Sequence, residues 1–138
     1  MKTLIAGTFD NFHVGHQWFI WSAIKEGSET VIIVARDKTV TRLKKQTPRN
    51  TELNRLARVK HEILNLETVS ARLGRSDADF WETIREEKPD QILLGYDQHV
   101  TPEAINKTSQ ILPLNAVRPI NQNFLRVLSF RHCHCERG

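Results

Sequence analysis

Two histidines, His13 and His16, stand three residues apart near the start of the chain, in the stretch GTFDNFHVGH of residues 7–16. If a helix begins there, side chains at this spacing share one face, so both imidazoles point at one spot. The first amides of a helix are unpaired and its dipole is positive at that end, which favours a bound phosphate. The pair therefore indicates a polyphosphate site, with a packed turn histidine as the alternative for each ring.

The elements around these histidines are predicted as a strand, a tight turn and a helix. An apolar run over residues 2–6 predicts the strand, and the bulky run over 14–26 predicts a helix that ends near Gly27. Gly7 ends the strand where the backbone can approach a ligand with no Cβ in the way. Asp10 could serve either as the cap of the helix or as a ligand.

The stretch resembles the GTFDxxHxGH signature of the HxGH nucleotidyltransferases, the superfamily of glycerol-3-phosphate cytidylyltransferase, phosphopantetheine adenylyltransferase and archaeal FAD synthase. The resemblance implies that a phosphate oxygen attacks the α-phosphorus of a nucleoside triphosphate and pyrophosphate leaves. Such catalysis depends mostly on positioning and on neutralising charge. His13 and His16 would then donate to the α- and β-phosphates, while Gly7, Thr8 and the Phe9 amide hold the triphosphate.

Lys44 is the cationic candidate outside this stretch. It is similar in placement to the family lysine that reaches across the substrate phosphates from the loop after the second strand, which implies a catalytic role. Lys45 is a rival one position away, and a solvated basic loop is the alternative for both.

Arg55 lies in a predicted helix, where the family carries an arginine that touches the triphosphate. The resemblance therefore implies nucleotide binding by Arg55, and Arg58, one turn further on, could take that role instead. An exposed arginine that pairs with Glu52 or Glu62 is the alternative.

Gly95, Asp97 and Gln98 follow the fourth predicted strand, at a corner that helps to form the nucleotide pocket in the superfamily. With residues 35–40, this corner looks most like archaeal FAD synthases, which transfer AMP from ATP to FMN. That resemblance implies ATP and FMN as substrates and a homodimer. On chemical grounds we expect Mg2+, which bridges triphosphate oxygens and is bound mainly through the nucleotide, so no protein ligands are assigned to it. The alternatives are cytidylyl transfer from CTP to glycerol 3-phosphate or a similar phospho-alcohol, and a catalytically weak nucleotide-binding module. A flavin would need an aromatic slot, for which the candidates, otherwise core residues, are Phe9, Phe12, Trp18, Trp21 and Tyr96.

Composition and charge narrow the class of protein. A chain of 138 residues with 39% hydrophobic and 26% charged residues fits one globular domain. It has no apolar run of about 20 residues and no signal-peptide pattern, so a cytoplasmic protein without a membrane partner is expected. The net charge of +4 suits polyanionic small molecules, and the scatter of basic residues argues against nucleic acid as a partner.

Strands alternate with helices along the chain, which predicts a single-domain α/β fold with a Rossmann-like, doubly wound parallel sheet. Further strands are predicted over 30–35, 67–73 and 91–94, with an edge strand over 111–117. Further helices are predicted over 51–64, 78–87 and 102–107, with a loop over 36–48 that could contain a short helical turn. Ligands of such sheets bind beyond the carboxyl ends of the strands, so the polar clusters that follow the strands should converge there.

Two of these helices carry apolar stripes that should face inward. The helix predicted over 51–64, capped by Asn50 or Thr51, would bury Leu53, Leu56, Val59 and Ile63. The helix predicted over 78–87, capped by Ser76 or Asp77, would bury Phe80, Trp81 and Ile84.

The nucleotidyltransferase domain is predicted over residues 1–120, followed by an atypical tail over 121–138. The family has a Ser/Thr-rich segment that opens a last helix and binds triphosphate, whereas here the tail offers only Ser129 and Arg131. We therefore expect Ser129 to bind nucleotide weakly, in a tail that is disordered or altered by a shifted reading frame. Cys133 and Cys135, with their neighbouring histidines, are too close together to wrap one tetrahedral zinc ion.

Overall fold

The computed structural model of the chain describes residues 1–77, 79–94 and 117–119. Five strands form its sheet: β1 (Lys2–Gly7), β2 (Glu29–Val34), β3 (Val69–Leu73), β4 (Gln91–Leu94) and β5 (Val117–Pro119). Their order is β3-β2-β1-β4-β5, and every neighbouring pair is parallel. The chain winds from β1 outward to β3 and then returns to add β4 on the other side. The predicted doubly wound parallel sheet is therefore confirmed, with its reversal of strand order between β1 and β4.

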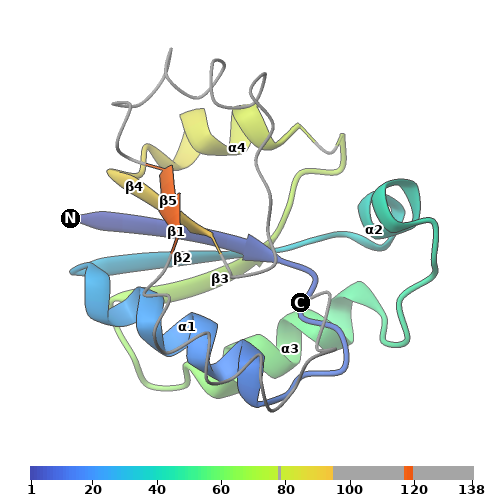
Figure 1. Cartoon of the computed structure of the whole chain (residues 1–138), viewed down its shortest axis with the longest axis horizontal. Coiled ribbons are helices and arrows are strands. Elements are labelled where there is room, and N and C mark those ends of the chain that lie inside the picture. Colours follow the sequence, from blue (N-terminus) through green and yellow to red (C-terminus); the bar gives the residue numbers. More distant parts are fainter. Residues whose placement is uncertain (78, 95–116, 120–138) are drawn as a thin grey trace.

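Helices cover both faces of this sheet (Figure 1). The helices α1 (Val14–Glu26) and α3 (Glu52–Glu62) lie on one face, and α4 (Phe80–Glu87) lies on the other. The helix α2 (Asp37–Lys44) stands apart from both layers, beyond the ends of the strands. The arrangement leaves the carboxyl edge of the sheet as the place where the chain can build a site.

Alternate residues of the strands point to opposite faces, and both faces are buried. Ile5 and Ile32 join the core under α1 and α3, while their neighbours Leu4 and Val31 join the core under α4. A strand covered on both sides has no polar face, which explains why the sequence of β2 shows no alternation.

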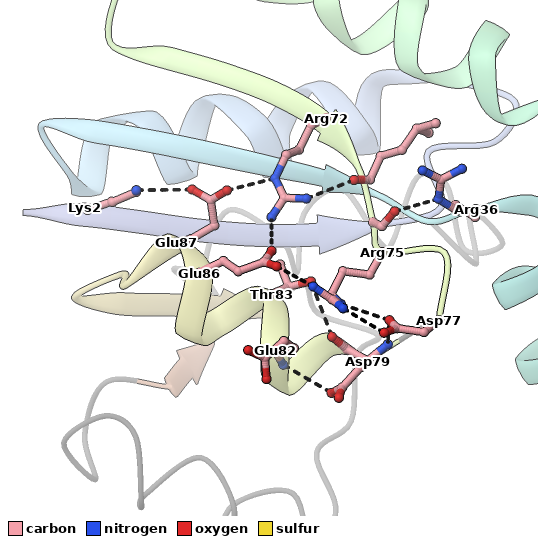
Figure 2. A network of polar contacts seen from close by, with 12 residues as sticks. Lys2, Arg36, Arg72, Arg75, Asp77, Asp79, Glu82, Thr83, Glu86 and Glu87 are labelled. Atoms are coloured by element: carbon pink, nitrogen blue, oxygen red, sulfur yellow. Dashed lines mark hydrogen bonds and ion pairs between the residues drawn. The ribbon is translucent and has the colours of Figure 1, made fainter.

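Ion pairs connect α4 to the strands beneath it (Figure 2). Glu87 pairs with Lys2 of β1 at 3.2 Å and with Arg72 of β3 at 2.8 Å. Arg72 also reaches Glu86 at 3.3 Å, and Glu86 in turn pairs with Arg75. These side chains are partly exposed, so each pair contributes only about 0–1 kcal/mol, and the apolar contacts of Ile84 remain the main attachment of α4.

The prediction of a loop over residues 36–48 with at most a short helical turn requires correction, because eight of these residues, 37–44, form the helix α2. The local sequence gives no start signal, since the N-cap residue Arg36 makes no side-chain capping bond. The cap comes from Glu52, whose carboxylate accepts a hydrogen bond from the Asp37 amide at 2.8 Å. A cap contributed by a later element is invisible to local sequence patterns.

The other helices begin close to the predicted points, with two corrections. Thr51 caps α3 as expected, but Leu53 is 67% exposed, because the buried positions of the helix are Arg55 and Val59, on the opposite side. Asp79 caps α4 in place of the predicted Ser76 or Asp77, and Asp77 instead forms an ion pair with Arg75.

Among the strands, β3 begins at Val69, two residues later than predicted, and β5 begins at Val117, the last residue of the predicted edge strand. The remainder of that prediction, over 111–116, and the predicted helix over 102–107 lie outside the described residues. No helix in the described part of the chain is long and apolar enough to cross a membrane.

Candidate active site

The first turn of α1 is capped by the two histidines themselves. His13 is the N-cap, and its Nδ1 accepts a hydrogen bond from the Gly15 amide at 3.0 Å. His16 reaches back, so that its Nδ1 accepts from the His13 amide at 3.1 Å. Both Nδ1 atoms therefore act as acceptors, which assigns the proton of each neutral ring to Nε2.

The two rings stack on one another, with centroids 4.0 Å apart. The ring of Phe12 stacks against His16 at 5.2 Å, and the ring of Phe9 lies 5.6 Å away. These neighbours leave the imidazole of His16 few ways to turn, so its ring is held in place before any ligand arrives.

His16 is a buried donor that lacks an acceptor. The residue is only 3% exposed, and its Nε2 has no hydrogen-bond partner among the described residues. Burial, followed by the proximity of His13 and Lys44, lowers the pKa of His16 to about 3, so the ring is neutral at pH 7. A buried N–H left unpaired costs about 1–3 kcal/mol, and a ligand oxygen placed against it would recover that energy.

Lys44 is exposed and ends α2, and its charge is one of the causes that lower the pKa of His16. Lys45 follows as the C-cap of the helix, with a left-handed backbone at φ 56°. The charge of Lys44 thus acts on His16, while its contact with the substrate phosphates stays a prediction.

Arg55 is buried, with 1% of the residue exposed, and its guanidinium holds backbone carbonyl groups together. Its NH1 donates to the Thr8 oxygen at 2.8 Å and to the Ala35 oxygen at 2.7 Å, and its Nε donates to the Asn50 oxygen at 3.0 Å. Its NH2 pairs with Asp37 at 2.6 Å. The alternative of an exposed arginine that pairs with Glu52 or Glu62 is therefore wrong for Arg55, whereas Arg58, whose side chain is 41% exposed, does pair with Glu62.

The direct contact with triphosphate predicted for Arg55 stays a prediction, and the structure adds a second role for this residue within the protein. An arginine has five N–H donors, and four hydrogen bonds from Arg55 end on protein acceptors. The guanidinium thus supports the ends of β1 and β2 from within the protein. The sequence missed this role because its acceptors lie up to 47 residues away.

Asp10 is neither the helix cap nor an open ligand. Its carboxylate accepts hydrogen bonds from the amides of Arg49 at 2.7 Å and Asn50 at 3.0 Å, and from the Asn50 side chain at 3.0 Å. Burial raises the pKa of Asp10, but these donors outweigh burial and hold it below its usual value. Asp10 therefore anchors the segment before α3 to the turn that carries the histidines.

Arg58 lies over the ring of Phe12, with its guanidinium carbon 4.3 Å from the centroid, and pairs with Glu62 at 3.3 Å. Glu62 also accepts from the Trp21 indole at 2.9 Å. Of the aromatic residues predicted for a flavin slot, Phe9 is a core residue that is 1% exposed, whereas Trp21 is 37% exposed and lies in the contact between α1 and α3. Tyr96 lies outside the described residues.

Other predicted site residues take their places at the same edge of the sheet or fall outside the described part. Gly7 ends β1, where its oxygen accepts from the Ala35 amide at 2.9 Å, and Thr8 follows, 7% exposed. Phe9 has a left-handed backbone at φ 55°, which is strained for a residue with a side chain and is found where a turn serves a function. The residues not described are Gly95, Asp97, Gln98, Ser129, Arg131, Cys133 and Cys135.

A doubly wound parallel sheet with paired, pre-oriented imidazoles at its first turn defines a nucleotide-handling α/β enzyme. A sequence profile of the cytidylyltransferase-like family matches residues 4–133, and the chain belongs to this family of nucleotidyltransferases.

The relatives of the chain agree with this assignment. FAD synthase from Methanosarcina acetivorans is 40% identical over 120 residues, which cover 85% of this chain and 75% of the relative. FAD synthase from Aciduliprofundum boonei is 37% identical over 108 residues, which cover 78% of this chain and 68% of the relative. A crystal structure of the lipopolysaccharide core biosynthesis protein from Thermoplasma volcanium superimposes with a TM-score of 0.71 at 33% identity, covering 88% of this chain and 96% of that one.

Proposed function

We propose that this chain is an FMN adenylyltransferase, which transfers AMP from ATP to FMN and so forms FAD and pyrophosphate. The observation that carries the chemistry is the buried Nε2–H of His16, a fixed donor without a protein acceptor in the described residues. The choice of ATP and FMN rests on the FAD synthases that are 37–40% identical to this chain. Cytidylyl transfer and a catalytically weak binding module have no comparable support.

In this proposal a phosphate oxygen of FMN attacks the α-phosphorus of ATP. The bond from that phosphorus to the oxygen that bridges to the β-phosphate breaks, and the electron pair leaves with pyrophosphate. His16 and His13 donate hydrogen bonds to the phosphate oxygens on which negative charge grows, and Lys44 supplies positive charge nearby. Because the pKa of His16 is about 3 in the chain without a ligand, its ring meets the triphosphate as a neutral donor with one N–H at Nε2.

The backbone at the end of β1 would hold the triphosphate. Gly7 would allow close approach, and Thr8 and the Phe9 amide would hold the triphosphate a few residues before the start of α1, where anions are stabilised. Gly95, Asp97, Gln98 and Ser129 remain predicted contributors to the nucleotide pocket.

The family chemistry calls for a divalent metal, and we assign Mg2+. Within the described residues no three His, Cys, Asp or Glu side chains gather as a metal site. The nearby carboxylate of Asp10 is occupied by backbone donors, and that of Asp37 by Arg55. The donor set therefore fits an ion that arrives bound to the triphosphate, where it neutralises phosphate charge.

The first test is pyrophosphate release with Mg2+, crossing ATP and CTP against FMN and glycerol 3-phosphate, with chromatography of the product. We expect release with ATP and FMN alone, together with FAD. Release with CTP and glycerol 3-phosphate would refute the assignment, and so would ATP binding without turnover.

The second test replaces the proposed donor. His16→Ala should lower kcat by a factor of about 10²–10³, the cost of removing one transition-state donor, with the fold intact by circular dichroism. His61→Ala, an exposed histidine of α3, is the matched control and should leave the rate unchanged. A normal rate in His16→Ala would remove the central role of the histidine pair.

Two further parts of the proposal have direct tests. Lys44→Ala should weaken ATP binding more than Lys45→Ala, because it is the charge of Lys44 that reaches His16. If the chain is a homodimer, light scattering after size-exclusion chromatography should give twice the mass of one chain, which is 16.0 kDa.

A further inference from the structure

The helix that carries Lys44 has few attachments of its own. Among the described side chains of α2, only Val40 is buried, and the helix stands away from the sheet (Figure 1). Its N-cap residue, Arg36, makes no side-chain capping bond. Because α2 has only one buried side chain among those described, the contacts of its first turn contribute strongly to where its far end, and Lys44, is placed.

Glu52, the first residue of α3, holds that turn. One carboxylate oxygen accepts from the Asp37 amide at 2.8 Å, and the other pairs with NH1 of Arg36 at 3.3 Å. A carboxylate is well suited to the start of a helix, where unpaired amides and the dipole are positive. Glu52 thus caps α2 from a neighbouring helix and ties down the residue before it.

Arg55, one turn further along α3, binds the same junction, the segment between β2 and α2. Its guanidinium donates to the Ala35 oxygen at 2.7 Å and pairs with the Asp37 carboxylate at 2.6 Å. The start of α3 is itself fixed to the histidine turn, because Asp10 binds the Asn50 amide and Arg55 donates to the Thr8 oxygen. One rigid support therefore connects the base of α2 to the turn that holds His13 and His16.

We propose that Glu52, together with Arg55, is a positioning residue that sets where Lys44 stands relative to His16. The inference rests on the proposed function, since it gives Lys44 its phosphate partner. Lys44 lies seven residues beyond Asp37, a lever of about 10 Å along the helix, so a tilt of about 10° moves it by about 2 Å. A displacement of about 1 Å in a positioning group can cost about 10²-fold in rate.

The test is a four-variant cycle of the intact chain: unaltered, Glu52→Ala, Lys44→Ala and the double variant. We expect Glu52→Ala to lower kcat/KM about tenfold or more in the unaltered background, and less than about twofold once Lys44 is gone. Glu52→Gln should retain part of the activity, because an amide oxygen can still accept from Asp37 while the pair with Arg36 is lost. Glu67→Ala, an exposed glutamate outside the junction, is the control.

Hydrogen exchange gives a readout that does not depend on turnover. Glu52→Ala should speed the exchange of amides in α2 while leaving those of β1 and α1 unchanged. An equal loss of kcat/KM in both backgrounds would overturn the proposal, because Glu52 would then act on the domain as a whole, and so would unchanged exchange in α2. Absence of turnover in the unaltered chain would refute the proposed function alone. The positioning role would then be decided by hydrogen exchange and by the dissociation constants of ATP measured for the same four variants.

Discussion

Replacing Arg55 by methionine tests how much the buried guanidinium contributes to the fold. Methionine fills most of the volume of the arginine stem but provides no donor. The Thr8 and Ala35 oxygens, which accept from NH1 at 2.8 and 2.7 Å, would lose their partner. The carboxylate of Asp37, which has 41% of its side chain exposed, can turn to water.

The magnitude follows from these losses. Leaving a buried acceptor unpaired costs about 1–3 kcal/mol, and Arg55→Met removes the donor from two carbonyl oxygens, those of Thr8 and Ala35. The partly exposed Asp37 adds little, because water can replace its partner. We therefore expect Arg55→Met to lower the free energy of unfolding by about 3–5 kcal/mol. For a chain of this length, at about 3 °C per kcal/mol, the melting temperature should fall by about 10–15 °C. Arg55→Lys should recover part of the loss, because one ammonium group cannot reach all four acceptors.

Urea unfolding followed by tryptophan fluorescence and circular dichroism measures this loss. Arg85→Met is the matched control: Arg85 is half exposed and pairs with Glu82 at 3.3 Å, so its loss should cost less than about 1 kcal/mol. A loss below about 1 kcal/mol in Arg55→Met would show that the guanidinium does not hold the ends of β1 and β2 together.

Two further predictions concern the same turn. Burial lowers the pKa of His16 from 6.5 to about 3. Below pH 6.5, His16 is therefore protonated in the unfolded chain but stays neutral in the folded chain. The free energy of unfolding should therefore fall as the pH drops, by about 2 kcal/mol between pH 6.5 and pH 5. In His16→Asn this part of the pH dependence should be absent. An equal pH dependence of the two chains in urea unfolding would contradict the pKa. Asp10→Asn should cost about 1–2 kcal/mol in thermal unfolding at pH 7, because its side chain offers fewer acceptors to the amides of Arg49 and Asn50, and an unchanged melting temperature would exclude the anchor.

Much of the fold was readable from short-range patterns. The helix α1 begins and ends at the predicted residues, because a bulky apolar run follows a glycine-containing turn and stops at Gly27. The unbroken β-branched run of β2 predicted a strand buried on both faces, which is how it lies between β1 and β3. The spacing of His13 and His16 likewise predicted that the two rings share one face.

The parts that could not be predicted have partners far away in the chain. Arg55 was expected to meet a ligand, but its acceptors come from residues 5 to 47 positions away. The helix α2 was expected to be a loop because its cap, Glu52, belongs to another helix 15 residues later. Asp10 was read as a cap or a ligand, and it binds amides 39 and 40 residues on.

The sequence by itself thus determined the order of strands and helices along the chain up to β4, apart from α2, and the pair of imidazoles at the first turn. Both follow from periodicity and spacing, which act over a few residues. Only the tertiary structure decided that His16 is buried with an open donor, that its pKa falls to about 3 and that Arg55 supports the site from within. Burial and hydrogen-bond partnership depend on which distant segments are packed together, and local patterns carry no record of that.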